Sequence, residues 1–234
     1  MRPDADPYRL PDELPAPVDD GAASHLEGRL LPSLELRSTS GRRVNVAEAA
    51  RERAVFYCYP GTLTPGTPIP VEWSLTPGAR GCTPQNRGYG LHHRELEMLG
   101  CQVYGVSGQG TTDPDRGLAE QRELAGRLAL PFELLNDSRF ELARALGLPT
   151  FEVRLDSPDF DYAGKKVHFV LQGATLLRRL TFVAERSRIV KVFYPVFPPD
   201  ADASGVLAYL RQTRGGPRRR GPAREKAHGT RPLA

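Results

Sequence analysis

The chain has 234 residues and a formal net charge of +4, which is the size of one domain with additional ends. Its hydrophobic content of 39% is low for a globular protein, and its 22 prolines and 23 glycines are many. No apolar run approaches the length of a membrane span and no signal-peptide pattern follows Met1. The three cysteines include no CxxC pair, so we expect a cytoplasmic protein without a disulfide framework.

The two ends of the chain explain part of this composition. Residues 1–28 are rich in Pro, Asp and Ala without an apolar period, and residues 214–234 hold seven basic residues against the single acid Glu225. We expect both segments to be disordered and to flank one domain over residues 29–213. The tail alone carries a charge of about +6, so the rest of the chain is slightly acidic. This pattern favours a solubilising tail over the alternative, a weak contact with nucleic acid or an anionic surface.

Strand and helix patterns alternate along the chain. Period-two and continuous apolar runs predict strands over residues 34–37, 43–46, 54–59, 101–107, 132–135, 151–154, 167–171, 176–184 and 189–196. Helical periodicity and end signals predict helices over residues 47–53, 86–99, 115–128, 139–146 and 204–212. Either Asp137 or Ser138 suits the N-cap of the fourth helix. The order predicts an α/β fold with a mixed sheet, helices on both faces and an N-terminal β-hairpin.

A long Pro/Gly/Thr loop over residues 62–81 leads to a cysteine at the start of a helix. Turn-forming residues precede Cys82, and Thr83 and Pro84 suit a first helical turn. Unpaired backbone N–H groups and the helix dipole favour the thiolate at such a position, and the thiolate is the nucleophilic form. A free cysteine is more often a small buried hydrophobe, but functional residues concentrate on loops, so both interpretations remain open from local chemistry.

Other combinations of reactive side chains are weaker. His92 and His93 are adjacent, so they point about 100° apart on a helix and do not suit one metal ion. The chain contains no phosphate-binding or dinucleotide-binding glycine pattern. The sequence therefore predicts neither a metal site nor a bound cofactor.

Five segments together resemble the peroxiredoxin family, in its bacterial AhpC/TSA and peroxiredoxin-Q-like form. They are residues 55–60, 81–85, 99–107, 135–137 with 145–149, and 179–182, and they fit in order between about residues 34 and 210. The resemblance implies a thioredoxin-like fold and a thiol-dependent peroxidase acting on hydrogen peroxide or organic hydroperoxides through a cysteine sulfenic acid. It also implies an external thiol reductant, such as thioredoxin, glutaredoxin or a small thiol, and a monomer or homodimer.

The resemblance assigns the site residues. Cys82 is the expected peroxidatic nucleophile, and Arg179 is expected to stabilise both the thiolate and the peroxide. Pro60 and Thr83 complete the set. Arg178 and Arg179 should alternate between the two faces of their predicted strand, so only one of them faces the site, and the family match selects Arg179.

One departure from the family pattern lies just before the cysteine. The family has a threonine three residues before it, which orients the peroxide and the thiolate, and this chain has Ala79 there. Thr76 and Thr83 are the candidate substitutes.

The second departure concerns the resolving cysteine that many members carry five residues after the first. Here that position is Arg87. Cys58 and Cys101 lie in predicted strands, where buried packing is favoured over a resolving role. The sequence therefore predicts a peroxidase of the one-cysteine type. The alternative is a degenerate peroxiredoxin-like module that senses redox state or binds a partner without turnover.

Overall fold

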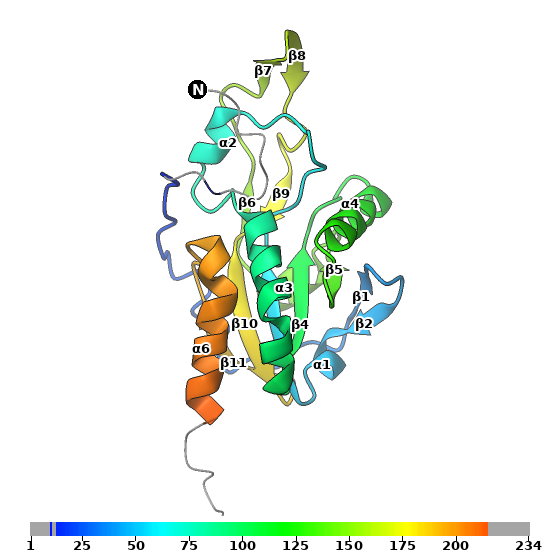
Figure 1. The fold of residues 1–234 in the computed structure, drawn as a ribbon, viewed down its shortest axis with the longest axis vertical. Coiled ribbons are helices and arrows are strands. Elements are labelled where there is room, and N and C mark those ends of the chain that lie inside the picture. Colours follow the sequence, from blue (N-terminus) through cyan, green and yellow to red (C-terminus); the bar gives the residue numbers. More distant parts are fainter. Residues whose placement is uncertain (1–9, 11–12, 215–234) are drawn as a thin grey trace, which may run out of the picture.

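The computed structural model describes residue 10 and residues 13–214. The strands of its main sheet are β1 (Glu35–Ser38), β2 (Arg43–Asn45), β3 (Arg53–Cys58), β4 (Gln102–Ser107), β5 (Glu133–Asn136), β10 (Leu180–Glu185) and β11 (Arg188–Phe193). They follow the order β11-β10-β3-β4-β5-β1-β2, with β3, β4 and β5 parallel and the other pairs antiparallel (Figure 1). This arrangement confirms the predicted mixed sheet and its N-terminal hairpin, β1–β2.

Helices cover both faces of this sheet, as the sequence predicted. They are α1 (Val46–Ala49), α2 (Val71–Leu75), α3 (Cys82–Met98), α4 (Pro114–Arg127), α5 (Glu141–Leu146) and α6 (Asp202–Arg214), with a 3-10 turn η1 (Pro199–Ala201) before the last. Val55 and Tyr57 of β3 pack against the core under α3, α4 and α6. Phe56 and Cys58 of the same strand pack into the core on the opposite face, with α1 and α5. Strand alternation therefore assigns each β3 side chain to one of two separate cores.

Local sequence signals account for several helix starts. The Asn45 side chain accepts hydrogen bonds from the first backbone N–H groups of α1, and Asp113 does the same for α4, whose first residue is Pro114. Asp137 lies before α5, yet its carboxylate accepts from the backbone N–H groups of Leu142 and Ala143 at 3.1 and 2.9 Å. Asp137 thus satisfies the first turn of α5 although Phe140 occupies the N-cap position.

Two segments outside the main sheet fold together. The expected loop over residues 62–81 contains α2, and residues 157–173 contain the hairpin of β7 (Asp159–Tyr162) and β8 (Lys165–His168) instead of one strand over 167–171. A two-stranded antiparallel sheet of β6 (Thr150–Glu152) and β9 (Thr175–Leu177) lies beside them and contributes Phe151 and Leu176 to the same core. Trp73 of α2 packs against Phe151 and Phe169, at ring-centroid distances of 6.4 and 5.3 Å. We call this small third core, built from residues 63–79 and 151–176, the Trp73 module.

The chain ends differ in part from expectation. Residues 13–28 were expected to be disordered, but Leu26 is fully buried and the Gly28 backbone N–H donates to the Ile189 carbonyl at 2.8 Å. Tyr194 Oη donates to Asp20 at 2.8 Å in the same region. A few apolar residues that reach the core are enough to order the segment, although they show no period. The remainder of the predicted N-terminal extension and nearly all of the tail over 214–234 lie outside the described residues, so those predictions stay open.

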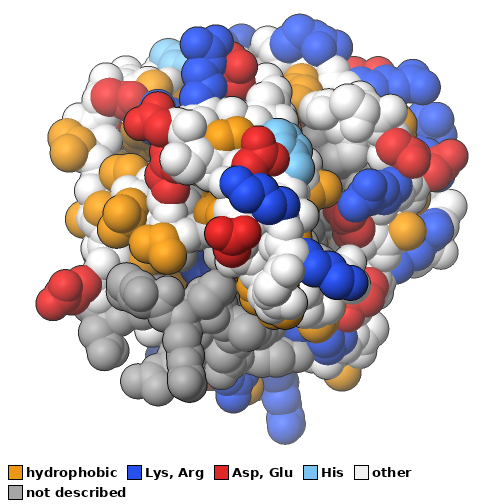
Figure 2. Space-filling model, turned by 90° about the horizontal axis from the view of Figure 1, so that it is seen from above, with side chains coloured by type: hydrophobic (Ala, Val, Ile, Leu, Met, Phe, Trp, Pro, Cys, Tyr) orange, Lys and Arg blue, Asp and Glu red, His pale blue; other side chains and the backbone are white. Residues whose placement is uncertain are grey.

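Two surface properties bear on possible partners. Among the helices of the described residues, none combines the length and apolar character needed to cross a membrane. Figure 2 shows the end of the molecule at β7 and β8, where acidic and basic side chains are interspersed and neither sign dominates.

Candidate functional site

The cysteine predicted at a helix start is the first residue of α3. The helix begins at Cys82, so the turn of Thr83, Pro84 and Gln85 continues directly into the periodic segment predicted from residue 86. Gly81 precedes it with a left-handed backbone, φ 104°, and a Cβ added there would lie 2.2 Å from Pro199 Cγ. Only glycine fits this combination of dihedral angle and close contact. The loop therefore places Cys82 at the N-terminus of α3, where the first backbone N–H groups have no partner within the helix.

Arg179 contacts the sulfur of Cys82. Its Nη2 donates to Cys82 Sγ at 3.3 Å and to the carbonyl oxygens of Arg80 and Gly78 at 3.1 and 3.4 Å. Its Nη1 donates to Gln85 Oε1, and its buried Nε has no hydrogen-bond partner within the described part of the chain. The guanidinium therefore anchors the loop before Cys82, and places a positive charge beside the sulfur.

Of the two neighbouring arginines Arg179 contacts Cys82, but regular strand alternation is not what separates them. The predicted strand over 176–184 is interrupted: Arg178 and Arg179 lie between β9 and β10. Arg178 is half-buried, and its Nε donates to the Thr150 carbonyl oxygen at 3.3 Å. Arg179 is 3% exposed and reaches Cys82. A break in the strand, and not regular alternation, separates the two side chains.

Behind Arg179 lies a buried carboxylate that the sequence did not reveal. Gln85 Nε2 donates to Asp202 Oδ2 at 2.7 Å, so Gln85 bridges Arg179 and Asp202. Burial raises the pKa of Asp202, against the opposing effect of its hydrogen bonds and of the Arg179 charge. Gln85 was visible within the cysteine motif. Asp202 lies more than a hundred residues further along and reads as an ordinary acidic residue in a first helical turn, so no local signal marks it.

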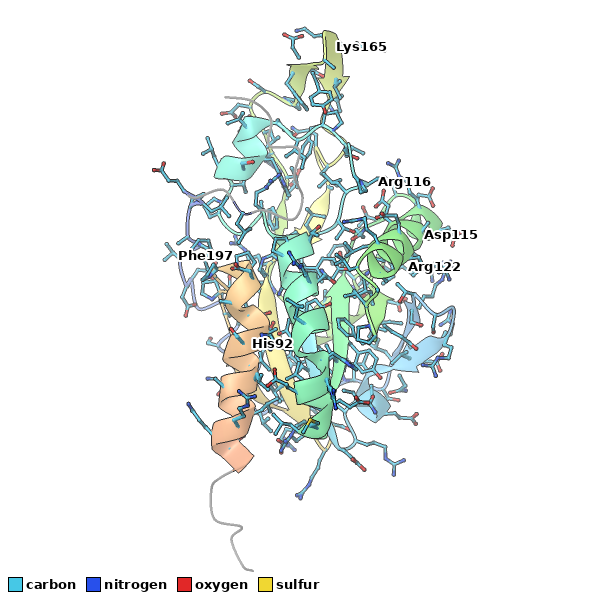
Figure 3. The ribbon with its side chains drawn as sticks, viewed as in Figure 1. His92, Asp115, Arg116, Arg122, Lys165 and Phe197 are labelled. Atoms are coloured by element: carbon cyan, nitrogen blue, oxygen red, sulfur yellow. The ribbon has the colours of Figure 1, made fainter. Side chains whose placement is uncertain are left out.

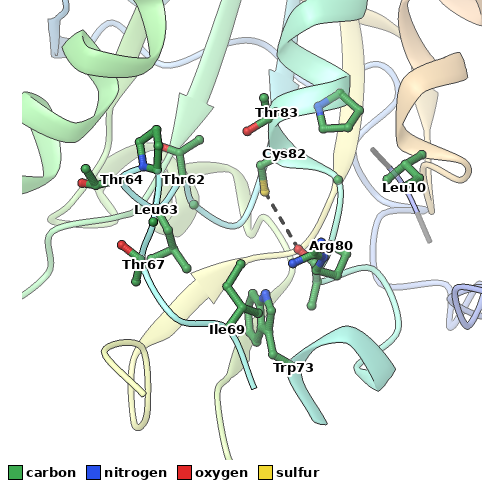
Figure 4. Close-up of a pocket in the computed structure, with 16 residues that line it drawn as sticks. Leu10, Thr62, Leu63, Thr64, Thr67, Ile69, Trp73, Arg80, Cys82 and Thr83 are labelled. Carbon is green, nitrogen blue, oxygen red and sulfur yellow. Dashed lines mark hydrogen bonds between the residues drawn. The ribbon is translucent and has the colours of Figure 1, made fainter. Parts of the chain in front are cut away.

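A pocket opens beside Cys82 (Figure 4). Its lining combines apolar side chains with several threonines: Leu10, Thr62, Leu63, Thr64, Thr67, Ile69, Trp73, Ala79, Arg80, Cys82, Thr83 and Pro84 are among them. The cavity measures about 70 Å³, which suits a small molecule reaching the sulfur. The Trp73 module supplies most of the apolar wall opposite α3.

Of the residues predicted to belong to the site beside Cys82, some line this pocket and others do not. Thr83 lines it, whereas Thr76, the other candidate substitute for the missing threonine, turns its hydroxyl to the Glu72 carbonyl oxygen at 3.2 Å. Thr62 also lines the pocket, and the sequence analysis did not propose it. Pro60 is buried behind the pocket wall, and its carbonyl oxygen accepts from Ser107 Oγ at 3.1 Å. Pro60 therefore shapes the loop and does not itself line the pocket.

The other two cysteines are buried, and neither lines the pocket beside Cys82. Cys58 is fully buried on the face of the sheet opposite α3, and burial raises its pKa. Cys101 follows the far end of α3, and the 17 residues of that helix span roughly 25 Å. Burial raises the pKa of Cys101 to about 12. Arg87, at the family's resolving position, is exposed on α3.

The two histidines have separate neighbours. His92, labelled in Figure 3, contacts Glu95 through Nδ1 at 3.1 Å. His93 stacks on Phe132 with ring centroids 5.5 Å apart. Within the described ranges, no three His, Cys, Asp or Glu side chains gather as a metal ion would require.

No protein-family model and no curated protein sequence matches the chain, but solved structures do. Peroxidoxin BcpB from Mycobacterium tuberculosis is 21% identical at a TM-score of 0.54, over 80% of this chain and 98% of its own. The bacterioferritin comigratory protein of Xanthomonas campestris, studied for alkyl peroxide reduction, is 20% identical at 0.53, over 80% and 99%. AhpC from Enterococcus faecalis is 16% identical at 0.55, over 81% and 93%. The chain has the fold of these peroxiredoxins.

Proposed function

We propose that the protein is a thiol-dependent peroxidase that reduces hydrogen peroxide or organic hydroperoxides. The observation that carries the proposal is the contact of Arg179 Nη2 with Cys82 Sγ, at 3.3 Å, at the first residue of a helix. A buried guanidinium and the backbone N–H groups of a helix start both place hydrogen-bond donors where charge moves during attack on a peroxide. The fold shared with peroxiredoxins and the reported alkyl peroxide activity of the Xanthomonas protein support the same reaction.

The reaction follows from the positions of these groups. The Cys82 thiolate attacks one oxygen of the peroxide, an S–O bond forms and the O–O bond breaks. The departing oxygen keeps the bonding electron pair and takes a proton to leave as water or an alcohol. Arg179 lies where it can donate to the sulfur and to a peroxide oxygen, so it stabilises the charge that moves from one to the other. Thr83 lines the pocket and offers its hydroxyl to the second oxygen, whereas the Thr62 hydroxyl donates to Gln109 Oε1 at 3.2 Å.

The product at Cys82 is a sulfenic acid, and an external thiol reduces it. The one-cysteine assignment is supported by the position of Cys58, across the sheet, and of Cys101, beyond α3. An added thiol attacks the sulfenic sulfur and releases water, and a second thiol then restores the thiolate. Thioredoxin, glutaredoxin and a small thiol are the candidate reductants, and we propose that the reaction takes place in the cytoplasm.

The test is peroxide consumption by the full chain with each candidate reductant, beside Cys82→Ser. Sustained turnover that is lost in Cys82→Ser supports the peroxidase. The second candidate, a redox-sensing module without turnover, is favoured by Ala79 in the pocket wall at the place of the family's threonine. It requires a single equivalent of peroxide to be consumed per Cys82, with no further consumption under any reductant. Consumption that is unchanged in Cys82→Ser would contradict both.

A further inference from the structure

A single carboxylate oxygen collects three side-chain hydrogen bonds behind the site. Asp202, at the start of α6, is 7% exposed. Its Oδ2 accepts from Gln85 Nε2 at 2.7 Å, from Thr181 Oγ1 at 2.7 Å and from Tyr89 Oη at 3.0 Å. Tyr89 is itself fixed by stacking on Tyr57, with ring centroids 4.0 Å apart. The carboxylate is thus held in one place by side chains from two other elements, α3 and β10.

Gln85 connects this carboxylate to the site, and its amide has a direction. One end of the amide donates and the other accepts. Because Nε2 faces the Asp202 carboxylate, Oε1 faces Arg179 Nη1, which donates to it. The reverse orientation would set the amide oxygen against a carboxylate and the amide N–H groups against a guanidinium. Asp202 therefore selects the one orientation of Gln85 that can hold Arg179.

The guanidinium of Arg179 is planar, so anchoring both terminal nitrogens fixes the direction in which it donates. Gln85 holds Nη1, while Nη2 contacts Cys82 Sγ. We propose that Asp202 is a positioning residue of the Cys82 site, which acts through the Gln85 amide to aim Arg179 at the sulfur. Only the measurement with peroxide rests on the proposed function. The contacts from Asp202 to Gln85, from Gln85 to Arg179 and from Arg179 to Cys82 are present without a substrate.

Two rates test the proposal on the full chain: the second-order reaction of Cys82 with hydrogen peroxide, and its alkylation by iodoacetamide at pH 7. Asp202→Ala removes the acceptor and is expected to lower both rates on the order of tenfold or more. Asp202→Asn keeps an oxygen that can accept from Gln85, so both rates should stay within roughly threefold of wild type. An Asn variant as slow as the Ala variant, or an Ala variant as fast as wild type, overturns the proposal.

A second comparison separates positioning from general loss of packing. Asp137→Ala removes a different buried carboxylate, which accepts from backbone N–H groups of α5 and does not contact Gln85, so it should lower the thermal midpoint without slowing the reactions of Cys82. Because Asp202 acts through Gln85, Gln85→Ala combined with Asp202→Ala should be no slower than Gln85→Ala alone. Additive losses overturn the proposal. Asp202→Leu, which fills the space without an acceptor, serves if Asp202→Ala does not fold.

The two readouts keep this proposal distinct from the proposed function. If wild type does not react with peroxide but Asp202→Ala slows alkylation, the peroxidase assignment fails and the positioning role stands. If wild type reduces peroxide and Asp202→Ala changes neither rate, the positioning role fails and the peroxidase assignment stands.

Discussion

At the scale of single residues, the site depends on what one guanidinium can reach. Arg179 is nearly completely buried and holds Gln85, two loop carbonyls and the sulfur of Cys82 at once. A lysine ammonium is a point charge and cannot bridge Gln85 and the sulfur in the same way. A positive charge at position 179 is therefore not sufficient to hold Gln85 and the Cys82 sulfur together.

We expect Arg179→Lys to lower the rate of peroxide reduction on the order of a hundredfold, as for loss of an oriented donor. Stopped-flow measurement of the Cys82 reaction checks this. Arg178→Ala is the matched control, because Arg178 contacts the Thr150 carbonyl and not the sulfur, and its rate should stay near that of wild type. Similar losses in both variants would show that the site needs positive charge and not this contact.

The ionisation of Asp202 should also appear in the stability of the fold. Burial raises its pKa in the folded chain above the unfolded value of about 3.9. Between these two values the unfolded chain binds fewer protons than the folded chain, so stability falls as the pH rises. Asn does not titrate. The stability of Asp202→Asn relative to wild type should therefore increase as the pH rises from about 4, by about 1.4 kcal/mol per unit by which the pKa is raised.

Urea unfolding of wild type and Asp202→Asn at a series of pH values between 4 and 8 measures this difference. Carboxylates elsewhere titrate equally in both proteins and cancel in the subtraction. A difference that is constant with pH, or that shrinks as the pH rises, contradicts the assignment of a raised pKa to Asp202.

At the scale of elements, the sequence predicted those strands and helix starts that depend on residues adjacent in the chain. The continuous apolar run of β3 and the Gly-Cys-Thr-Pro start of α3 were correct because strand burial and helix starts are read from adjacent positions. The Trp73 module was predicted only in part: the predicted strands over residues 151–154, 167–171 and 176–184 overlap β6, β8 and β9, whereas α2 and β7 were not predicted. The packing of residues 63–79 against residues 151–176 joins segments that are distant in sequence, so no local signal marks it. Asp202 was missed for the same reason: only the folded chain brings α6 against α3.

The start of α3 provides a test at this scale. Gly81→Ala combines a left-handed backbone with a Cβ that meets Pro199, whereas Gly100 also has a positive φ, 69°, with nothing within 4 Å of its added Cβ. We expect Gly81→Ala to destabilise the fold by about 2 kcal/mol or more and to slow Cys82, and Gly100→Ala to cost about 1 kcal/mol without slowing Cys82. Thermal unfolding and the peroxide rate measure both. Equal effects would mean that the Pro199 contact does not shape the site.

At the scale of the whole molecule, the sheet separates Cys58 from the other two thiols, and the length of α3 separates Cys82 from Cys101. Cys58 lies in the core on one face and Cys82 in the core on the other, while Cys101 lies beyond the far end of α3. A disulfide needs Cα atoms within about 7 Å. Cys101 lies beyond that limit while α3 stays folded, and Cys58 lies in the core on the other face of the sheet from Cys82.

We therefore expect one equivalent of peroxide to leave a sulfenic acid at Cys82, or a mixed disulfide with an added thiol. Peptide mass spectrometry after trapping with dimedone checks this, with Cys82→Ser as the unlabelled control. A peptide linking Cys82 to Cys58 or to Cys101 as the main product would make that cysteine the resolving residue.

Because the three thiols differ in accessibility, the number of reactive thiols measures how far the chain has unfolded. Only Cys82 faces a pocket, while Cys58 and Cys101 are closed within the two cores. A small reagent such as methyl methanethiosulfonate should therefore count one thiol per native chain and all three cysteines after denaturation. Intermediate counts during a denaturant series would report how much of the core has opened, without any dye or engineered label.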